Sequence, residues 1–327
     1  MRLIAVEEHT SNAAMNKASG TAMKQAAPNY YKGLRKDLPY FPGPGQMGLG
    51  ESRLADMDAN GIDMQVLIGA ASMWMEPEEA IPLAQAANDE LAVAIEPNPD
   101  RFAAFASLPT CAPEAAAQEL ERAVGLGFRG AAIMGRPGDT FLDDPVYAPI
   151  LETASRLSMP LYLHPGLPLR SVQEAYYEGL DPVVSGRLLS FGWGWHAEAG
   201  IQLLRMILSG VFEKYPNLQI ISGHWGEMVP FFLDRLDESL PIEATGLSQT
   251  ISETFKKHIY VTSSGMFSTP QLLFTLQVLG VDNILFSVDY PFVQNAGARA
   301  FLENAPLSQD DREKIAHANA ERLLKLN

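Results

Sequence analysis

The stretch GFRGAAIMGRPGDTFLDDPVYAPILETASRLSMPLYLHPG, residues 127–166, decides the fold. Its apolar runs predict strands at residues 130–134 and 160–163, and the periodic segment between them predicts a helix at residues 145–157. Two strands joined by such a crossover helix run parallel, because the helix returns the chain to the end of the sheet where the first strand began. The stretch is therefore one unit of a parallel α/β sheet.

The same alternation continues in both directions along the chain. Strand patterns fall at residues 3–6, 64–68, 102–107, 130–134, 160–163, 218–222, 259–261 and 284–287. Helical patterns fall at residues 52–60, 77–95, 113–124, 145–157, 197–212, 231–240, 270–279, 298–303 and 308–326. Eight strand–helix units in roughly 290 residues favour a closed (β/α)8 TIM barrel, and an open doubly wound sheet is the alternative.

Residues 10–50 depart from this alternation. They are rich in Gly, Pro, Asn and Tyr, and no Pro/Ser-rich linker divides the rest of the chain. We therefore expect a single domain over residues 1–327, with residues 10–50 as an inserted loop region after the first strand. A loop of that length in a compact domain is usually functional or disordered, and here it would lie over the C-terminal, active-site face of the barrel.

The composition excludes several classes of partner. Acidic residues number 39 against 24 basic ones, which gives a net charge of −15 and disfavours nucleic acid and anionic membrane surfaces. No apolar run reaches the roughly 18 residues that a membrane-spanning helix needs. The single cysteine, Cys111, cannot form an intrachain disulfide or a cysteine-based zinc cluster. We expect a cytoplasmic protein.

Histidines and carboxylates follow four of the predicted strands. Glu7 and His9 follow the first strand, and His164, His224 and Asp289 follow three later ones. Each alone is weak evidence, because a histidine after a strand is often structural and an aspartate there is often a helix cap. In a barrel, however, these strand ends converge on one face. Together they predict a site for Zn²⁺, or for Mn²⁺ or Fe²⁺ if oxygen ligands dominate.

Two further histidines, His258 and His317, are predicted to lie on the surface. His258 precedes its strand, at the opposite end of the barrel from the predicted site, and His317 lies in a polar terminal helix. We expect both to be exposed.

Further polar and aromatic residues surround the predicted site. Glu227 either orients His224 by accepting its ring N–H or is a solvated carboxylate at a helix start. Pro230 predicts that the regular helix begins near residue 229, which leaves His224 and Glu227 in the turn before it. Trp193 and Trp195, in the glycine-rich loop FGWGWHAE, form either a wall for a flat aromatic ligand or ordinary lid packing.

The motifs resemble a known enzyme family over residues 1–9 and 51–327. EEH at 7–9, RLADMDANGID at 53–63, SGVFEKYPNLQIISGHWGE at 209–227 and NILFSVDYPF at 283–292 resemble the second amidohydrolase family. Within it they look most like the γ-resorcylate and 2,3-dihydroxybenzoate decarboxylases, which are metal-dependent and non-oxidative. This resemblance implies one divalent ion, Zn²⁺ or Mn²⁺, held by Glu7, His9, His164 and Asp289.

The resemblance also implies roles for the neighbouring residues. His224 is implied to lie beside the metal. The chemistry itself needs an acid that protonates the ring carbon before CO₂ leaves, and Asp289 is the candidate, helped by His224 and Glu227. Arg235 is a candidate contact for the substrate carboxylate or phenol, including from a neighbouring subunit. Phe292, in the SVDYPF ending, is expected to border an aromatic acid substrate.

Two alternatives to decarboxylation stay open at this point. A metal-dependent hydrolase or hydratase of a lactone or enol acid would use Asp289 or His224 as a general base for water. A non-enzymatic binding barrel would leave the strand-end residues idle. The resemblance further implies a homo-oligomer, either a dimer or a tetramer.

Overall fold

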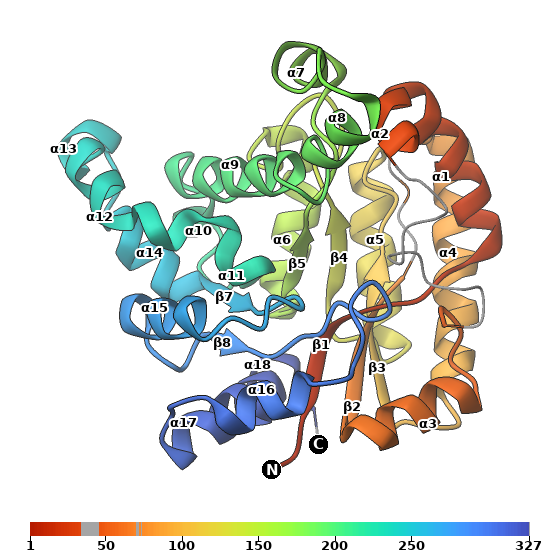
Figure 1. The fold of residues 1–327 in the computed structure, drawn as a ribbon. Helices are drawn as coiled ribbons and strands as arrows, with labels where there is room; N and C mark the ends of the chain where they lie inside the picture. The colour runs from red at the N-terminus through yellow and green to blue at the C-terminus, as the bar shows by residue number, and fades with distance from the viewer. Residues whose placement is uncertain (34–45, 70–71, 73, 327) are drawn as a thin grey trace.

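The computed structural model describes residues 1–33, 46–69, 72 and 74–326, and parallel strands form its centre (Figure 1). The eight-stranded sheet has the order β1-β2-β3-β4-β5-β6-β7-β8, with every neighbouring pair parallel. The strands are β1 (Ile4–His9), β2 (Met64–Ile68), β3 (Phe102–Ser107), β4 (Ala131–Met134), β5 (Leu161–His164), β6 (Ile220–Ser222), β7 (Ile259–Thr262) and β8 (Ile284–Leu285).

The sheet curves round until its last strand lies beside its first. The N–H of Val6 in β1 donates to the carbonyl of Phe286, just after β8, at 3.0 Å. The N–H of His9 donates to the carbonyl of Tyr290 at 2.6 Å. The predicted TIM barrel is confirmed, and the open sheet is wrong.

Helices follow the strands and cover the outside of the barrel (Figure 1). In the first half they are α1 (Ala13–Ala26), α2 (Pro28–Gly33), α3 (Glu51–Asn60), α4 (Pro77–Ile95), α5 (Pro113–Gly125), η1 (Pro145–Tyr147) and α6 (Ala148–Leu157). Next come α7 (Arg170–Tyr176), α8 (Pro182–Leu188), α9 (Gly194–Leu208), α10 (Val211–Lys214), α11 (His224–Glu227), α12 (Val229–Ser239) and α13 (Ile242–Thr245). The last are α14 (Ile251–His258), α15 (Thr269–Leu279), α16 (Ala298–Asn304), α17 (Gln309–Glu313), η2 (Lys314–Ala318) and α18 (Asn319–Leu324).

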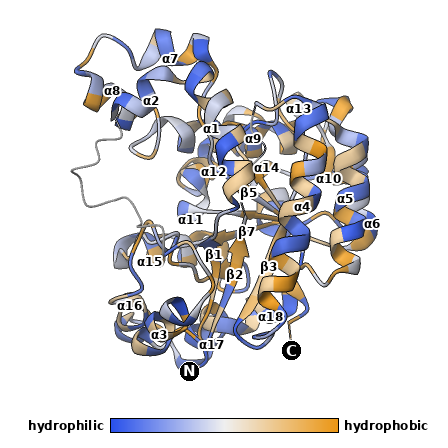
Figure 2. Cartoon of the chain, turned by 90° about the vertical axis from the view of Figure 1, so that its right-hand side faces the viewer, coloured by the Kyte–Doolittle hydropathy of each residue, from blue (hydrophilic) through white to orange (hydrophobic). Residues whose placement is uncertain are grey.

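Alternate residues of each strand serve two different cores. Side chains inside the barrel, such as Val66, Phe105 and Tyr162, pack together with Leu323 and Leu324 of α18. The opposite faces of the strands pack against the surrounding helices. Figure 2 shows the resulting apolar centre. The C-terminal helix therefore closes the end of the barrel at which both termini lie, and the strand ends opposite it are left for a functional site.

The insertion after β1 is helical where the sequence favoured an irregular loop. It contains α1 and α2, and the Asn12 side chain caps α1 by accepting the N–H of Met15 at 2.9 Å. Helix α2 lies beside α8, at the end of the barrel away from the termini (Figures 1 and 2). A Cβ on Gly33 would lie 2.7 Å from the Cα of Gly186, so these two helices touch through their glycines. Residues 34–45 lie outside the described part of the chain.

The prediction of an exposed His258 is wrong. The residue is 2% exposed, its Nδ1 lies 2.9 Å from the carbonyl oxygen of Leu218, and its ring centroid is 4.8 Å from that of Phe212. His258 is the last residue of α14, directly before β7, and its ring packs beneath α10, which carries Phe212. His317 is partly exposed, as its side chain retains 22% of its accessible surface between Glu313 and Glu321.

Within the described residues, no helix combines the length and the apolar character that crossing a membrane requires.

Candidate active site and metal centre

Four of the predicted residues meet at the C-terminal end of the barrel. Glu7 and His9 extend from β1, His164 ends β5, and Asp289 follows β8. One ligand atom from each lies within 4.8 Å of the other three. His9 Nε2 is 2.9 Å from Asp289 Oδ1, and His164 Nε2 is 3.6 Å from Glu7 Oε1. The arrangement brings two imidazoles and two carboxylates to one point.

Hydrogen bonds leave the inward-facing atoms of this cluster free. Oε2 of Glu7 accepts hydrogen bonds from the hydroxyls of Ser264, Thr262 and Ser287, whereas its Oε1 is buried and accepts none from the part of the chain that the structure describes. Nδ1 of His164 lies 2.8 Å from the carbonyl oxygen of Pro165, which fixes the proton on that nitrogen and leaves the lone pair on Nε2. Nε2 of His9 and Oδ1 of Asp289 lie 2.9 Å from each other, and neither is hydrogen-bonded to any other described residue. Buried polar atoms that converge without partners fit a divalent cation.

The electrostatics of the cluster point in the same direction. Burial, together with Asp289, raises the pKa of Glu7, although the charge of His224 opposes this. Burial, together with His9 and His224, holds the pKa of His164 well below its usual value. A neutral imidazole is the form that donates a lone pair to a metal, so His164 is prepared for ligation without first losing a proton.

Beside this cluster a buried carboxylate joins two histidines. Oε1 of Glu227 is 2.8 Å from Nδ1 of His224, and Oε2 is 2.8 Å from Nδ1 of His196. Nε1–H of Trp195 donates to Nε2 of His196 at 3.1 Å, and the same Nε2 lies 3.1 Å from the carbonyl oxygen of Phe191. Glu227 therefore orients His224, and the same contacts extend to the loop that carries Trp195. Of the two readings of Glu227, the solvated helix-start carboxylate is wrong, because the residue is 1% exposed.

The ligand atoms of His196, His224 and Glu227 also lie within 4.8 Å of one another. Each oxygen of Glu227 is already engaged with one imidazole. This group is therefore arranged as a hydrogen-bonded relay rather than as a second ion site.

The carboxylates around His224 favour its charged form. Burial alone would lower the pKa of His224. The carboxylates of Glu227, Glu7 and Asp289 outweigh burial and raise the pKa to about 9. For the carboxyl group of Glu227 burial acts in the raising direction. Its contacts with His224 and His196 outweigh burial, so the pKa of Glu227 lies below its ordinary value. Near neutral pH His224 is therefore charged, with one ring proton directed at Glu227 from Nδ1 and the other on Nε2.

The turn that carries these residues has an unusual backbone. His224, Trp225, Glu227 and Met228 have φ values of 49°, 59°, 53° and 67°, the left-handed region that residues other than glycine rarely adopt. The Oγ of Ser264 accepts the His224 N–H at 2.9 Å, and Trp225 Nε1 donates to the Met266 carbonyl at 2.9 Å. Regular helix α12 begins at Val229, as Pro230 predicts. A run of such residues is typical of functional sites.

Aromatic rings border one side of the cluster. The Phe292 ring centroid is 5.0 Å from that of His9, and the Trp195 centroid is 6.4 Å from that of His164. Trp195 also packs against a small apolar cluster that contains Ala27, Leu167, Tyr177 and Leu189. Trp193 is 49% exposed at the N-terminal end of α9. Of the two tryptophans, Trp195 is therefore the one that adjoins the predicted metal ligands.

Arg235 does not join the site within one chain. Its side chain is 70% exposed and pairs with Glu238 on the same helix at 2.9 Å. Helix α12 buries Val229, Pro230 and Leu233, and Arg235 is not among these buried residues. The predicted contact of Arg235 with a substrate stays a prediction.

Comparison with known proteins identifies the family. Residues 37–326 match the family model described as amidohydrolase. The chain belongs to the amidohydrolase family. The resemblance inferred from the sequence motifs is thereby confirmed.

Similar amidohydrolases include named decarboxylases. The γ-resorcylate decarboxylase of Polaromonas sp. (strain JS666) is 38% identical over 291 residues, which cover 85% of this chain and 87% of that protein. The structure of 5-carboxyvanillate decarboxylase from Sphingomonas paucimobilis has a TM-score of 0.89 at 32% identity and covers 100% of this chain and 99% of its own. A dihydroxybenzoic acid decarboxylase from Polaromonas sp. JS666, with bound manganese and the inhibitor 2-nitroresorcinol, has a TM-score of 0.83 at 33% identity and covers 100% and 97%.

The sequence patterns do not identify two residues beside the candidate ligands. Nothing local shows that α9 brings His196 to Glu227. Glu8 lies between two candidate ligands, but β1 has an irregular register between Ala5 and Glu8. The alternation that places Ile4 and Val6 inside the barrel therefore does not by itself assign the face of Glu8.

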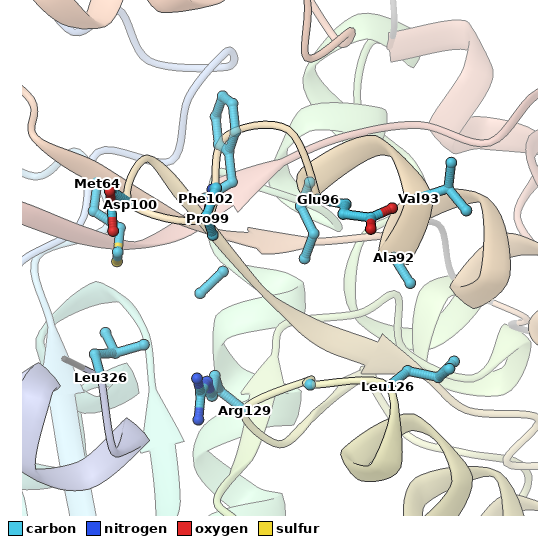
Figure 3. Close-up of a pocket in the computed structure, with 13 residues that line it drawn as sticks. Met64, Ala92, Val93, Glu96, Pro99, Asp100, Phe102, Leu126, Arg129 and Leu326 are labelled. Carbon is cyan, nitrogen blue, oxygen red and sulfur yellow. The ribbon is translucent and has the colours of Figure 1, made fainter.

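A separate cavity lies at the other end of the barrel. Its volume is about 560 Å³, and Met64, Phe102, Arg129 and Leu326 are among its lining residues (Figure 3). Met64 and Phe102 begin β2 and β3, so this cavity adjoins the N-terminal ends of the strands. In TIM-barrel enzymes that end contributes stability rather than chemistry, and the cavity is not the active site.

Proposed function

We propose that this amidohydrolase is a metal-dependent, non-oxidative decarboxylase of a hydroxybenzoate-type acid. The observation that carries the proposal is a proton-bearing His224 beside a four-residue cluster fit for a divalent ion. Ring protonation needs an acid next to the ion that binds the substrate, and this site combines the two. The named decarboxylases of similar sequence and structure support the same reaction class.

Glu7, His9, His164 and Asp289 would hold one divalent ion. When bound, the ion supplies Lewis-acid stabilisation of the phenolate and orients it together with the adjacent carboxylate. Manganese in a related structure supports Mn²⁺, and the mixed nitrogen and oxygen ligands are also suited to Zn²⁺. The engagement of Glu227 with two histidines supports one ion rather than two.

Asp289 would deliver a proton to the ring carbon that bears the carboxylate. His224 would replace that proton from Nε2, while Glu227 keeps the imidazole in position through Nδ1. With the new C–H bond formed, the bond to the carboxylate breaks, CO₂ leaves, and the bonding electron pair returns to the ring. The ring regains its aromaticity, and no redox step is involved.

The substrate ring would lie against Trp195 and Phe292. Both border the cluster, and an aromatic contact of this kind is worth about 1 kcal/mol beyond the burial of surface. Trp193, the more exposed tryptophan, would contribute less. We also propose that the described parts of the 10–50 insertion, residues 10–33 and 46–50, cover the active-site face of a single domain. Helix α2 of this insertion lies beside α8, and Ala27 packs in the same apolar cluster as Trp195.

Arg235 would act in a neighbouring subunit. It projects from α12 close to the exposed rings of Phe231 and Phe232, and the Phe231 ring lies 5.6 Å from that of Phe274 on α15. Three exposed aromatic rings beside an arginine suit an interface between copies of an acidic chain. The dimer or tetramer and the cytoplasmic location stay predictions.

The decisive experiment uses enzyme reconstituted with Mn²⁺ and, separately, with Zn²⁺. A panel of hydroxybenzoates and lactones is incubated in heavy water, with CO₂ release and product mass as readouts. We expect CO₂ from an ortho-hydroxy acid and one deuterium at the carbon that lost it. Acid release from a lactone without CO₂ would overturn the proposal in favour of hydrolysis.

A further inference from the structure

We infer that Glu8 is a positioning residue of this active site, whose buried carboxylate holds the backbone on both sides of Asp289 and thereby directs the Asp289 side chain. Glu8 lies in β1 between two candidate metal ligands, but its side chain points to the opposite face of the strand. It is fully buried. The mechanism proposed above does not use it.

The Glu8 carboxylate binds the two peptide groups that flank Asp289. Oε1 accepts the N–H of Val288 at 2.8 Å, and Oε2 accepts the N–H of Tyr290 at 3.0 Å. The two contacts come from residues immediately before and after Asp289. They therefore act on the segment from both ends, and Asp289 itself is left free to face the cluster.

Asp289 needs such support because of its backbone conformation. Its φ is 66°, in the left-handed region that costs free energy for any residue with a side chain. Without contacts that favour this conformation, the loop after β8 would relax and turn the carboxylate away from His9 and His164. The two backbone N–H groups that flank Asp289 both donate to the buried carboxyl group of Glu8, and these two hydrogen bonds hold the segment in that conformation.

Arg53 of α3 completes the support on the side of β1. It is 1% exposed, its Nη1 donates to the carbonyl of His9 at 2.7 Å, and its Nε donates to the side chain of Gln65 at 2.6 Å. The guanidinium carbon lies 4.9 Å from the centre of the Tyr290 ring. Arg53 thus fixes the chain at His9, and its positive charge favours the carboxylate form of Glu8, which burial opposes.

The purely structural explanation is that the charge of Arg53 and the buried carboxyl group of Glu8 attract each other and stabilise the barrel, and nothing more. The two explanations differ in what geometry they require. Charge attraction needs only a negative group near Arg53, whereas positioning needs two acceptor oxygens at the Val288 and Tyr290 N–H groups. Variants that separate charge from geometry therefore test the inference.

Glu8→Gln keeps the size of the side chain but places an NH₂ donor against one of the two backbone N–H groups. We expect a 10–100-fold weaker binding of Mn²⁺ to the metal-free protein, as is typical when the support of a ligand is removed. We also expect kcat to fall by about 10–100-fold with a smaller change in KM, and faster hydrogen exchange in a peptide covering residues 286–292.

The matched control is Glu119→Gln. Glu119 is also 1% exposed and hydrogen-bonded, to Asn88 at 2.6 Å and to Arg122 at 2.8 Å, but it lies on α5 in the outer layer. This variant should lower the melting temperature without changing Mn²⁺ affinity, kcat or exchange of residues 286–292. If Glu8→Gln behaves like Glu119→Gln in all three readouts, Glu8 is structural only and the inference is wrong.

Glu8→Asp gives a second test should Glu8→Gln not fold. Aspartate keeps a carboxyl group near Arg53, but its side chain is one methylene group shorter. Both oxygens therefore lie farther from the N–H groups of Val288 and Tyr290. We expect it to fold with weakened Mn²⁺ binding, and wild-type Mn²⁺ affinity in Glu8→Asp would overturn the inference. The inference rests on the proposed function only for the kcat readout. Mn²⁺ affinity and hydrogen exchange test Glu8 even if the enzyme proves to catalyse another reaction.

Discussion

Asp289 has two proposed tasks that oppose each other, since a metal ligand is best as an anion and an acid must carry a proton. The structure offers a way to reconcile them in the adjacent His224, whose pKa is about 9 because burial is outweighed by the surrounding carboxylates. The proton can then reside on the imidazole until the substrate ring accepts it through Asp289. In the proposed mechanism Asp289 therefore binds the metal and passes the proton on, while His224 stores the proton.

Replacing Asp289 tests this division directly. Asp289→Asn keeps the shape and one oxygen but cannot deliver a proton. We expect decarboxylation to fall by at least about 10²–10⁴-fold, the usual value of acid–base help. Mn²⁺ and a nitro analogue of the substrate should still bind, more weakly, in a calorimetric titration. Near wild-type turnover of the metal-loaded variant would rule out Asp289 as the proton donor.

His258 allows a test of residue-level electrostatics away from the site. Burial lowers its pKa, and Lys257 adds to this, although the Leu218 carbonyl opposes them. The folded state therefore favours neutral His258, and the unfolded chain takes up the proton first as the pH falls through about 6.5. The stability that the neutral residue contributes is thus present above that pH and is lost progressively below it.

His258→Leu should reveal that pH dependence. At pH 7.5 we expect the variant to be less stable by about 1–3 kcal/mol, because the Leu218 carbonyl loses its buried partner. The difference from the wild type should shrink at pH 5.5, since only the wild type has a histidine whose protonation favours unfolding. Urea unfolding at the two pH values measures this. A difference that stays constant or widens on acidification would contradict the assignment.

At the scale of elements, the contact between α2 and α8 connects the insertion after β1 to the segment before Trp195. A Cβ on Gly186 would lie 2.5 Å from the carbonyl oxygen of Asn29 and 2.7 Å from the Cα of Gly33, both in backbone that cannot simply rotate aside. Gly186→Ala should therefore separate the helices and cost about 1–3 kcal/mol. We expect KM for the aromatic acid to rise, since Trp195 packs in the cluster that these helices support.

The control for this variant is Gly125→Ala at the end of α5, where an added Cβ meets nothing within 4 Å. Alanine there should leave KM unchanged and stability equal or slightly higher, by up to about 1 kcal/mol. Urea unfolding and steady-state kinetics on both variants decide the matter. Equal behaviour of the two alanine variants would show that the glycine contact does not hold the insertion in place.

Elements were predictable where local patterns alone specify them. Strands at 64–68 and 102–107 match the structure because continuous apolar runs bounded by turns are typical of fully buried strands. Helices α1 and α2 were missed because the Gly- and Pro-rich second half of residues 10–50 outweighed the helix-forming AAMNKASGTAMKQA. The four candidate ligands follow from strand ends, whereas His196 depends on how α9 packs. Tertiary packing of this kind leaves no mark on local sequence.

At the scale of the whole molecule, each chain carries a net charge of −15, so two copies repel each other electrostatically. A homo-oligomer therefore needs favourable contacts that outweigh this repulsion. Phe231 is 72% exposed and Phe232 is 52% exposed on α12, and we expect them to supply the apolar contact. Phe231→Ser should weaken self-association in sedimentation velocity. Val93→Ser, at a valine that is 68% exposed on α4, serves as the control and should leave it unchanged. Equal sedimentation of both variants and the wild type would place the interface elsewhere.

The position of Arg235 makes a stronger prediction about the assembly. If Arg235 serves the site of a neighbour, Arg235→Ala and Asp289→Asn each inactivate a homodimer for different reasons. Co-expression of the two variants gives mixed dimers at random. In a mixed dimer the site of the Arg235→Ala chain keeps its Asp289 and receives Arg235 from the Asp289→Asn chain, so that one site is intact. About one quarter of all sites should then be intact, because half of the dimers are mixed and each has one complete site. Activity near that fraction supports a shared site. If Arg235 acts within its own chain, mixing restores nothing, and if Arg235→Ala alone is fully active, Arg235 has no part in the reaction.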